Sequence, residues 1–98
     1  MKINLSDKAK EKLDELFPKM ESDKALRLYV AAYGWGGPSF GMALEEPEDT
    51  DLRYTVDGYD FIVEEGFDQV YQGFEIGYTD SLLRKGFTVT PARGGSSC

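Results

Sequence analysis

The sequence contains no histidine and only one cysteine, Cys98. Without histidine, a single chain cannot assemble a serine–histidine or cysteine–histidine nucleophile, and it lacks the commonest protein ligand for metals. A lone cysteine cannot form a disulfide within the chain. These absences exclude the familiar nucleophilic hydrolases and leave one thiol per chain for soft metal chemistry.

Basic residues are also scarce, since 11 lysines and arginines face 18 aspartates and glutamates, for a formal net charge of −7. Nucleic acids and anionic membranes both attract basic patches, so we expect neither as a partner. No apolar stretch approaches the roughly 18 residues of a membrane-spanning helix, and the opening residues MKINLSDKAKEKL do not resemble a signal peptide. We therefore expect a cytoplasmic protein.

The length of 98 residues predicts a single domain, residues 1–98, in which the Gly/Ser-rich residues 91–98 form a flexible tail. Its first part predicts an amphipathic helix, with Ser6 as the N-cap and Pro18 as the end. The apolar stripe of this helix recurs at spacings of three and four, at Leu5, Ala9, Leu13, Leu16 and Phe17.

After residue 24 the apolar period changes to two, which predicts about six short strands. In the first of them Leu26, Leu28, Val30 and Ala32 share one face, and Arg27, Tyr29 and Tyr33 share the other. Asp57-Gly58 is a strong hairpin signal, and residues 66–73 predict a turn or a single helical turn. Because the strands follow one another without long helices between them, we expect a mainly β, α+β fold with an antiparallel or mixed sheet. The expected strands are residues 25–33, 39–46, 52–56, 59–65, 74–80 and 86–90.

The loop YGWGGPSFG, residues 33–41, combines glycine, proline and the only tryptophan of the chain. Taken alone, Gly34, Gly36 and Gly37 predict a turn that needs positive φ, and Trp35 would fold back to cap the edge of the core. The loop matches neither a dinucleotide fingerprint nor a phosphate loop. The acidic run that follows predicts a solvated turn without the spacing of a calcium loop, and comprises Glu45, Glu46, Glu48, Asp49 and Asp51.

In their order, these parts resemble the HesB-like family, the A-type iron–sulfur cluster carriers. The resemblance rests on LSDKAKEKL, the Gly-rich loop followed by an aromatic residue, the Asp-Gly hairpin, IGYTDSLLRKGFTVT and a Gly/Ser/Cys tail. The loop is most similar to a branch of the family that reads GYGxGGPSFG, where x is cysteine or selenocysteine. Trp35 occupies that position, and the indole offers only an N–H donor and no lone pair for iron.

The resemblance implies a compact, twisted β-fold of two small sheets with the helix packed on one side. It also implies a protein that is not an enzyme and that carries iron or an iron–sulfur cluster, with scaffold or recipient proteins as partners and a homodimer as one arrangement. The loop at Gly34, Gly36 and Gly37 would then meet the tail, where Cys98 would be the metal ligand and where Gly94 and Gly95 would let the chain move.

Two questions stay open at this stage. Position 35 is either an encoded tryptophan or a UGA codon at which selenocysteine was replaced. In addition, the same fold could serve as a metal-free interaction or regulatory module, in which exposed aromatic side chains form the contact surface. The candidates for that surface are Trp35, Tyr33, Phe40 and Tyr29.

Overall fold

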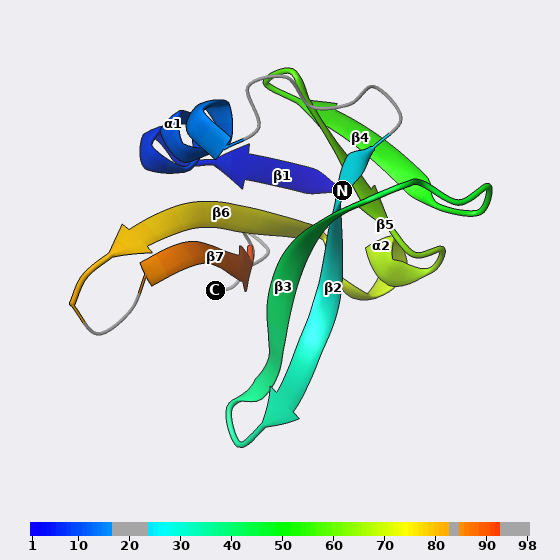
Figure 1. The fold of residues 1–98 in the computed structure, drawn as a ribbon. Helices are drawn as coiled ribbons and strands as arrows, with labels where there is room; N and C mark the ends of the chain where they lie inside the picture. The colour runs from blue at the N-terminus through cyan, green and yellow to red at the C-terminus, as the bar shows by residue number, and fades with distance from the viewer. Residues whose placement is uncertain (17–23, 83–84, 93–98) are drawn as a thin grey trace.

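The computed structural model describes residues 1–16, 24–82 and 85–92, and within them it forms two small β-sheets with two helices (Figure 1). One sheet has the strand order β1-β6-β7 and the other has the order β3-β2-β5-β4. The strands are β1 (Lys2–Leu5), β2 (Ala25–Gly34), β3 (Gly37–Glu45), β4 (Leu52–Val56), β5 (Tyr59–Val63), β6 (Gly73–Asp80) and β7 (Lys85–Pro91), and the helices are α1 (Asp7–Leu16) and α2 (Phe67–Val70).

The predicted fold class is confirmed, because both sheets are mixed and the long helix lies near the N-terminus. β1 runs parallel to β6 and β2 runs parallel to β5, while the remaining strand pairs are antiparallel. The Asp57-Gly58 turn is also confirmed, since both residues have positive φ, 52° and 88°. The predicted single helical turn is α2, which follows Gly66 at a φ of 93°.

The N-terminal segment differs from the prediction in one respect, because the helix is preceded by a strand. Leu5 belongs to β1 rather than to the helical stripe, and the Ser6 N–H donates to the Ile76 carbonyl at 2.9 Å. Ser6 is the N-cap as expected, since its Oγ accepts from the Ala9 N–H at 3.0 Å. Ala9 and Leu13 are fully buried, whereas Phe17 and Pro18 lie outside the described residues. A strand of four residues shows too few alternations of apolar and polar side chains to be distinguished in the sequence from the start of a helix.

The core lies where the two sheets face each other and is closed at one end by aromatic side chains. Phe40 from β3 packs edge-on against Phe74 from β6, with ring centroids 4.9 Å apart. Phe67 and Tyr71, from α2 and the residue after it, contact both rings. These contacts join the sheets through the face of β3 that carries Phe40.

Arg27 binds two carboxylates near the end of the β2–β3 pair that lies farthest from the Trp35 turn. Its Nε donates to Glu45 Oε1 at 2.6 Å, and its Nη1 and Nη2 donate to the two Asp51 oxygens at 3.0 and 2.5 Å. The Asp51 side chain is only 5% exposed, so the expectation of a fully solvated acidic turn is wrong at this residue. The separation of 24 residues between Arg27 and Asp51 hid the pair from sequence patterns.

We expect Asp51→Asn to lower the free energy of unfolding by about 2 kcal/mol at pH 7, because it removes a charged partner of a bidentate pair. The hydrogen bonds from Arg27 hold the pKa of the Asp51 carboxyl below its ordinary value of 3.8. This contribution is therefore fully present above pH 3.8 and disappears as the pH falls through the lower folded-state pKa.

Urea unfolding between pH 7 and pH 2 measures this difference, which should shrink at acid pH. Asp49→Asn is the matched control, because Asp49 is exposed in the same loop, and we expect a change within about 0.5 kcal/mol. An equal effect of both variants would contradict the assignment.

Gly73 is needed where β1 meets β6. A Cβ at this position would overlap the backbone carbonyl oxygen of Lys2. We expect Gly73→Ala to cost about 1–3 kcal/mol, because the parallel strand pair must shift to make room. Gly36→Ala is the control, since an added Cβ there meets nothing within 4 Å, and it should be nearly neutral. Thermal unfolding of the two variants side by side tests this, and a Gly73→Ala protein as stable as wild type would refute it.

Candidate functional site

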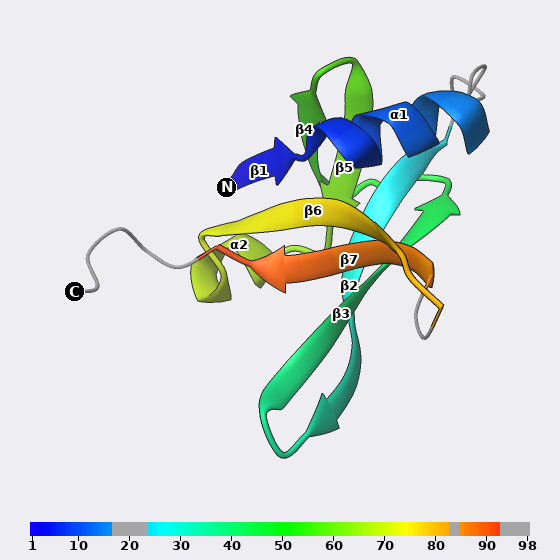
Figure 2. The ribbon, with the colours of Figure 1, turned by 90° about the vertical axis from the view of Figure 1, so that its left-hand side faces the viewer.

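The β2–β3 hairpin protrudes from the molecule, because its distal half extends beyond the other strands of both sheets (Figures 1 and 2). Residues 31–39 are all exposed. The base of the hairpin is held by the core and by Arg27, whereas no helix or strand of the described residues packs over its distal half in either view. The hairpin therefore presents its tip to solvent.

The tip consists of Trp35 and Gly36 between the paired residues Gly34 and Gly37. Gly37 has a φ of 104°, so the predicted need for positive φ is confirmed there, but neither Gly34 nor Gly36 has a positive φ. Trp35 is 107% exposed, and the expectation that it caps the core is therefore wrong. The physical reason is distance from the core, since the hairpin carries residue 35 beyond the last apolar layer.

A β-bulge changes the pattern of faces along β2. The register shifts between Val30 and Ala32, and after it Tyr33 pairs with Pro38 rather than continuing the alternation. Directly paired residues of antiparallel strands share a face, so Tyr33 lies on the face of Pro38 and Phe40. The expectation that Tyr29 and Tyr33 share a face is therefore wrong, because the bulge inserts one residue between them.

The aromatic candidates for a contact surface are divided by the structure. Trp35, Tyr33 and Tyr29 are 107%, 79% and 38% exposed. Phe40 is only half-buried, but its ring packs against Phe67, Tyr71 and Phe74, so it belongs to the core and not to the surface. The exposed aromatic surface of the hairpin therefore has three members.

The tail residues Cys98, Gly94 and Gly95 lie outside the described residues, so their meeting with the Trp35 loop stays a prediction. The start of the expected tail is ordered, because Pro91 belongs to β7 and the Ala92 N–H donates to the Gly73 carbonyl at 2.9 Å. Six residues span at most about 20 Å, which bounds the distance of the thiol from Ala92. Within the described part of the chain, aspartate and glutamate side chains nowhere gather in threes as a metal site requires.

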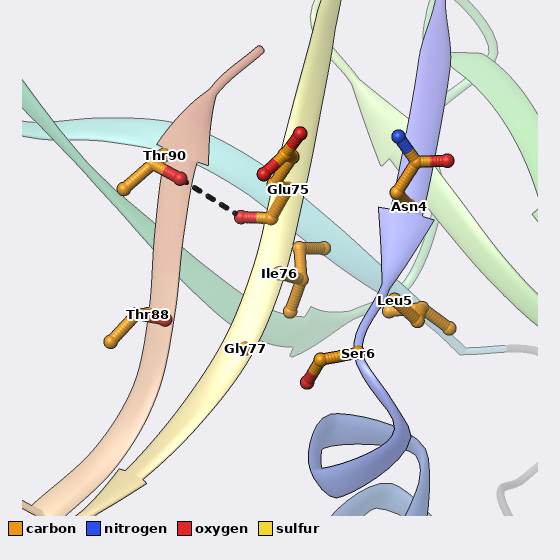
Figure 3. Close-up of a pocket in the computed structure, with 8 residues that line it drawn as sticks. All are labelled: Asn4, Leu5, Ser6, Glu75, Ile76, Gly77, Thr88 and Thr90. Atoms are coloured by element: carbon orange, nitrogen blue, oxygen red, sulfur yellow. Dashed lines mark hydrogen bonds between the residues drawn. The ribbon is translucent and has the colours of Figure 1, made fainter.

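Two hollows that were not predicted from the sequence lie beside the hairpin and on the smaller sheet. One, of about 330 Å³, lies beside β2 and is lined by residues that include Arg27, Val30, Tyr33 and Glu64. The other, of about 370 Å³, lies on the β1-β6-β7 sheet next to the start of α1 (Figure 3). Its lining includes Asn4, Ser6, Glu75, Gly77, Thr88 and Thr90.

The second hollow exists because Gly77 has no side chain. A Cβ there would lie 3.0 Å from Thr88 Oγ1. Two of its hydroxyl groups are engaged, since Ser6 Oγ accepts from the Ala9 N–H and Thr90 Oγ1 donates to the Glu75 carbonyl at 3.3 Å, the bond drawn in Figure 3. A glycine inside an alternating strand was the sequence signal for this space.

Neither of the helices that the structure describes has the length and apolar character needed to traverse a bilayer.

No protein-family model matches the chain. Among curated proteins, the iron–sulfur cluster insertion protein ErpA of Xanthomonas euvesicatoria pv. vesicatoria (strain 85-10) is 30% identical over 98 residues. The alignment covers 98% of this chain and 77% of that protein. ErpA of Xylella fastidiosa (strain 9a5c) matches with the same identity and coverage.

Two solved structures have a similar fold. IscA with the [2Fe–2S] cluster has a TM-score of 0.69 at 22% identity, and the match covers 98% of this chain and 88% of that one. SufA of Escherichia coli, described as involved in the biosynthesis of iron–sulfur clusters, has a TM-score of 0.65 at 25% identity, covering 99% and 86%. The chain belongs to the family of ErpA-like iron–sulfur cluster insertion proteins, the A-type HesB-like carriers.

Proposed function

We propose that this protein binds iron or an iron–sulfur cluster as cargo and hands it on to scaffold or recipient proteins in the cytoplasm. The proposed binding region is the hairpin tip at Gly34–Gly37 together with Cys98 of the tail, all within a single domain of residues 1–98. Support comes from its relatives, which are named as iron–sulfur cluster insertion proteins and match 98% of the chain. The proposed role is transfer, with no enzymatic step.

One observation about the tip carries the proposal. Gly34 and Gly36 have neither a positive φ nor any neighbour that a Cβ would touch. Nothing within the described chain therefore requires glycine at these positions. Glycine also serves where another group must approach the backbone closely, so the tip is suited to a ligand from outside the fold.

The soft donors of one chain are too few for a complete cluster. A [2Fe–2S] or [4Fe–4S] cluster is normally held by four thiolates, and this sequence has only Cys98. Trp35 stands where the similar branch of the family has cysteine or selenocysteine, and its indole cannot bind iron through a lone pair. A second copy raises the number of thiolates only to two, so carboxylates, a small thiol or a partner protein must supply the remaining ligands.

The identity of the natural residue 35 decides between two forms of this proposal. If codon 35 is UGA, selenocysteine supplies a second soft ligand, and two chains provide four. If tryptophan is encoded, the cargo is held mainly by Cys98 and by donors from the partner, and a mononuclear iron becomes the better fit. Reading codon 35 in the gene separates the two forms.

A second candidate function is a metal-free interaction module of the same fold. The observation that favours it is the exposure of Trp35 and Tyr33, 107% and 79%, at the end of a protruding hairpin. Large aromatic side chains in such places serve as anchors of protein interfaces.

Reconstitution with ferrous iron and sulfide under anaerobic conditions tests the proposed function. We expect Trp35→Cys to bind about one iron per chain with visible charge-transfer absorption, because two chains then supply the four thiolates of one [2Fe–2S] cluster. Cys98→Ser should abolish this absorption in the Trp35→Cys background.

Trp35→Ser is the matched control, since it changes the same exposed position without adding a thiolate. Iron analysis and absorption spectra are compared for the wild type, Trp35→Cys, Trp35→Ser and the Trp35→Cys/Cys98→Ser double variant. A colourless Trp35→Cys protein would favour the metal-free module, and a cluster that survives Cys98→Ser would place the ligand elsewhere.

A further inference from the structure

The β2 strand has one edge that the sheet leaves unpaired over most of its length. β3 pairs with β2 from Ala25 to Gly34, but β5 pairs with it only through Leu26 and Arg27. β5 ends at Val63 and the chain turns into α2. The register places Val63, the last residue of β5, beside Leu28, and beyond it the edge of β2 opposite β3 faces no other strand of the described chain (Figure 1).

A cavity lies beside this unpaired edge. The cavity of about 330 Å³ is lined by Leu28, Tyr29 and Val30 of β2, by Tyr33 beyond the bulge, and by Phe67 at the start of α2. It therefore continues the line of β5 along β2, with the unpaired edge on one side and a lining that is mainly aliphatic and aromatic but includes the charged residues Arg27 and Glu64. Unpaired edges of this kind accept an added strand, with main-chain hydrogen bonds for affinity and side-chain pockets for specificity.

The net charge around the cavity is negative. Arg27 lies at one end, but its guanidinium is engaged by Glu45 and Asp51. Glu64 also lines the cavity, is exposed and forms no ion pair among the described residues. The hairpin from Leu28 to Leu44 contains no charged residue in a chain that is 30% charged. An occupant would therefore meet an uncharged strand that ends at a free carboxylate.

A second copy of this chain fits the edge poorly. Symmetric pairing about the middle of the edge would bring the bulge at Val30–Ala32 of each copy against that of the other, where the ladder is interrupted. Each copy also carries a net charge of −7, which opposes their approach.

We infer that the free edge of β2 beyond Leu28 binds an extended segment of another protein, with apolar side chains in the cavity and a basic residue at Glu64. This inference extends the proposed function, because a carrier must hold the protein to which it delivers. It concerns contacts that need neither iron nor Cys98, so its failure and that of the proposed function are separable.

The test is an NMR titration of the ¹⁵N-labelled protein, without iron or sulfide, with two capped six-residue peptides. Both alternate threonine with valine and phenylalanine, and one begins with lysine and the other with glutamate. We expect the lysine peptide to bind more tightly and to shift the backbone amides of Leu28–Val30. Glu64→Lys should weaken the lysine peptide about three-fold and make the glutamate peptide the tighter ligand, as expected for one exposed ion pair.

Matched controls separate the site from general effects. Glu65→Lys makes the same charge change one residue away, outside the lining, and should preserve the preference for lysine. Tyr33→Ala should weaken both peptides about five-fold, since it removes an aromatic wall, whereas Leu82→Ala, at an exposed position outside the lining, should not.

Three results would overturn the inference. One is the absence of shifts at Leu28–Val30 with either peptide at about 1 mM, a concentration that detects even weak binding. Another is a reversal of preference by Glu65→Lys as large as that by Glu64→Lys. The third is sedimentation of the wild-type protein as a dimer that Tyr33→Ala dissociates, which would assign the edge to a second copy.

Discussion

The contact between Phe40 and Phe74 is the interaction on which the arrangement of the molecule depends. Its two rings come from different sheets, meet at 4.9 Å with an interplanar angle of 70°, and are enclosed by Phe67 and Tyr71. Aromatic pairs of this geometry contribute about 0.5–1.5 kcal/mol beyond the area they bury. Phe40 directly follows the exposed run 31–39, so the same contact determines where β3 returns from the tip to the core.

Arg27 complements this contact at the other end of the β2–β3 pair. By binding Glu45 and Asp51 it ties β2, the end of β3 and the following loop together through charged hydrogen bonds. Its positive charge is thereby neutralised within the fold, whereas Glu64, which lines the neighbouring cavity, has no ion pair among the described residues. The hairpin thus combines a fixed base with an uncharged shaft and an exposed tip. A protein that binds cargo at one end of an element and a partner along its edge would use this division.

Features that depend on neighbours in sequence were predictable, and those that depend on distant pairing were not. The Ser6 cap, the Asp57-Gly58 turn and the short helix before Tyr71 follow from local chemistry and are present. The strand β1 was missed because its four residues are defined by parallel pairing with β6, about 70 positions later. The bulge in β2 was equally hidden, because a period of two carries no mark of one inserted residue, and it reversed the predicted face of Tyr33. For the candidate site, the sequence located the loop but could not show that Trp35 stands clear of the core.

The exposure of Trp35 also bears on what its identity means. A residue that is 107% exposed and flanked by glycines with no neighbours contributes little to folding, and substitutions at such positions usually change stability by less than about 0.5 kcal/mol. Folding therefore places almost no constraint on position 35, and tryptophan, cysteine and selenocysteine are all compatible with the same hairpin. The difference between them is one of ligand chemistry alone, since a thiolate or selenolate donates electron pairs to iron and an indole does not. Because the fold is indifferent to this residue, the choice among these side chains would alter the proposed binding at the tip and leave the hairpin unchanged.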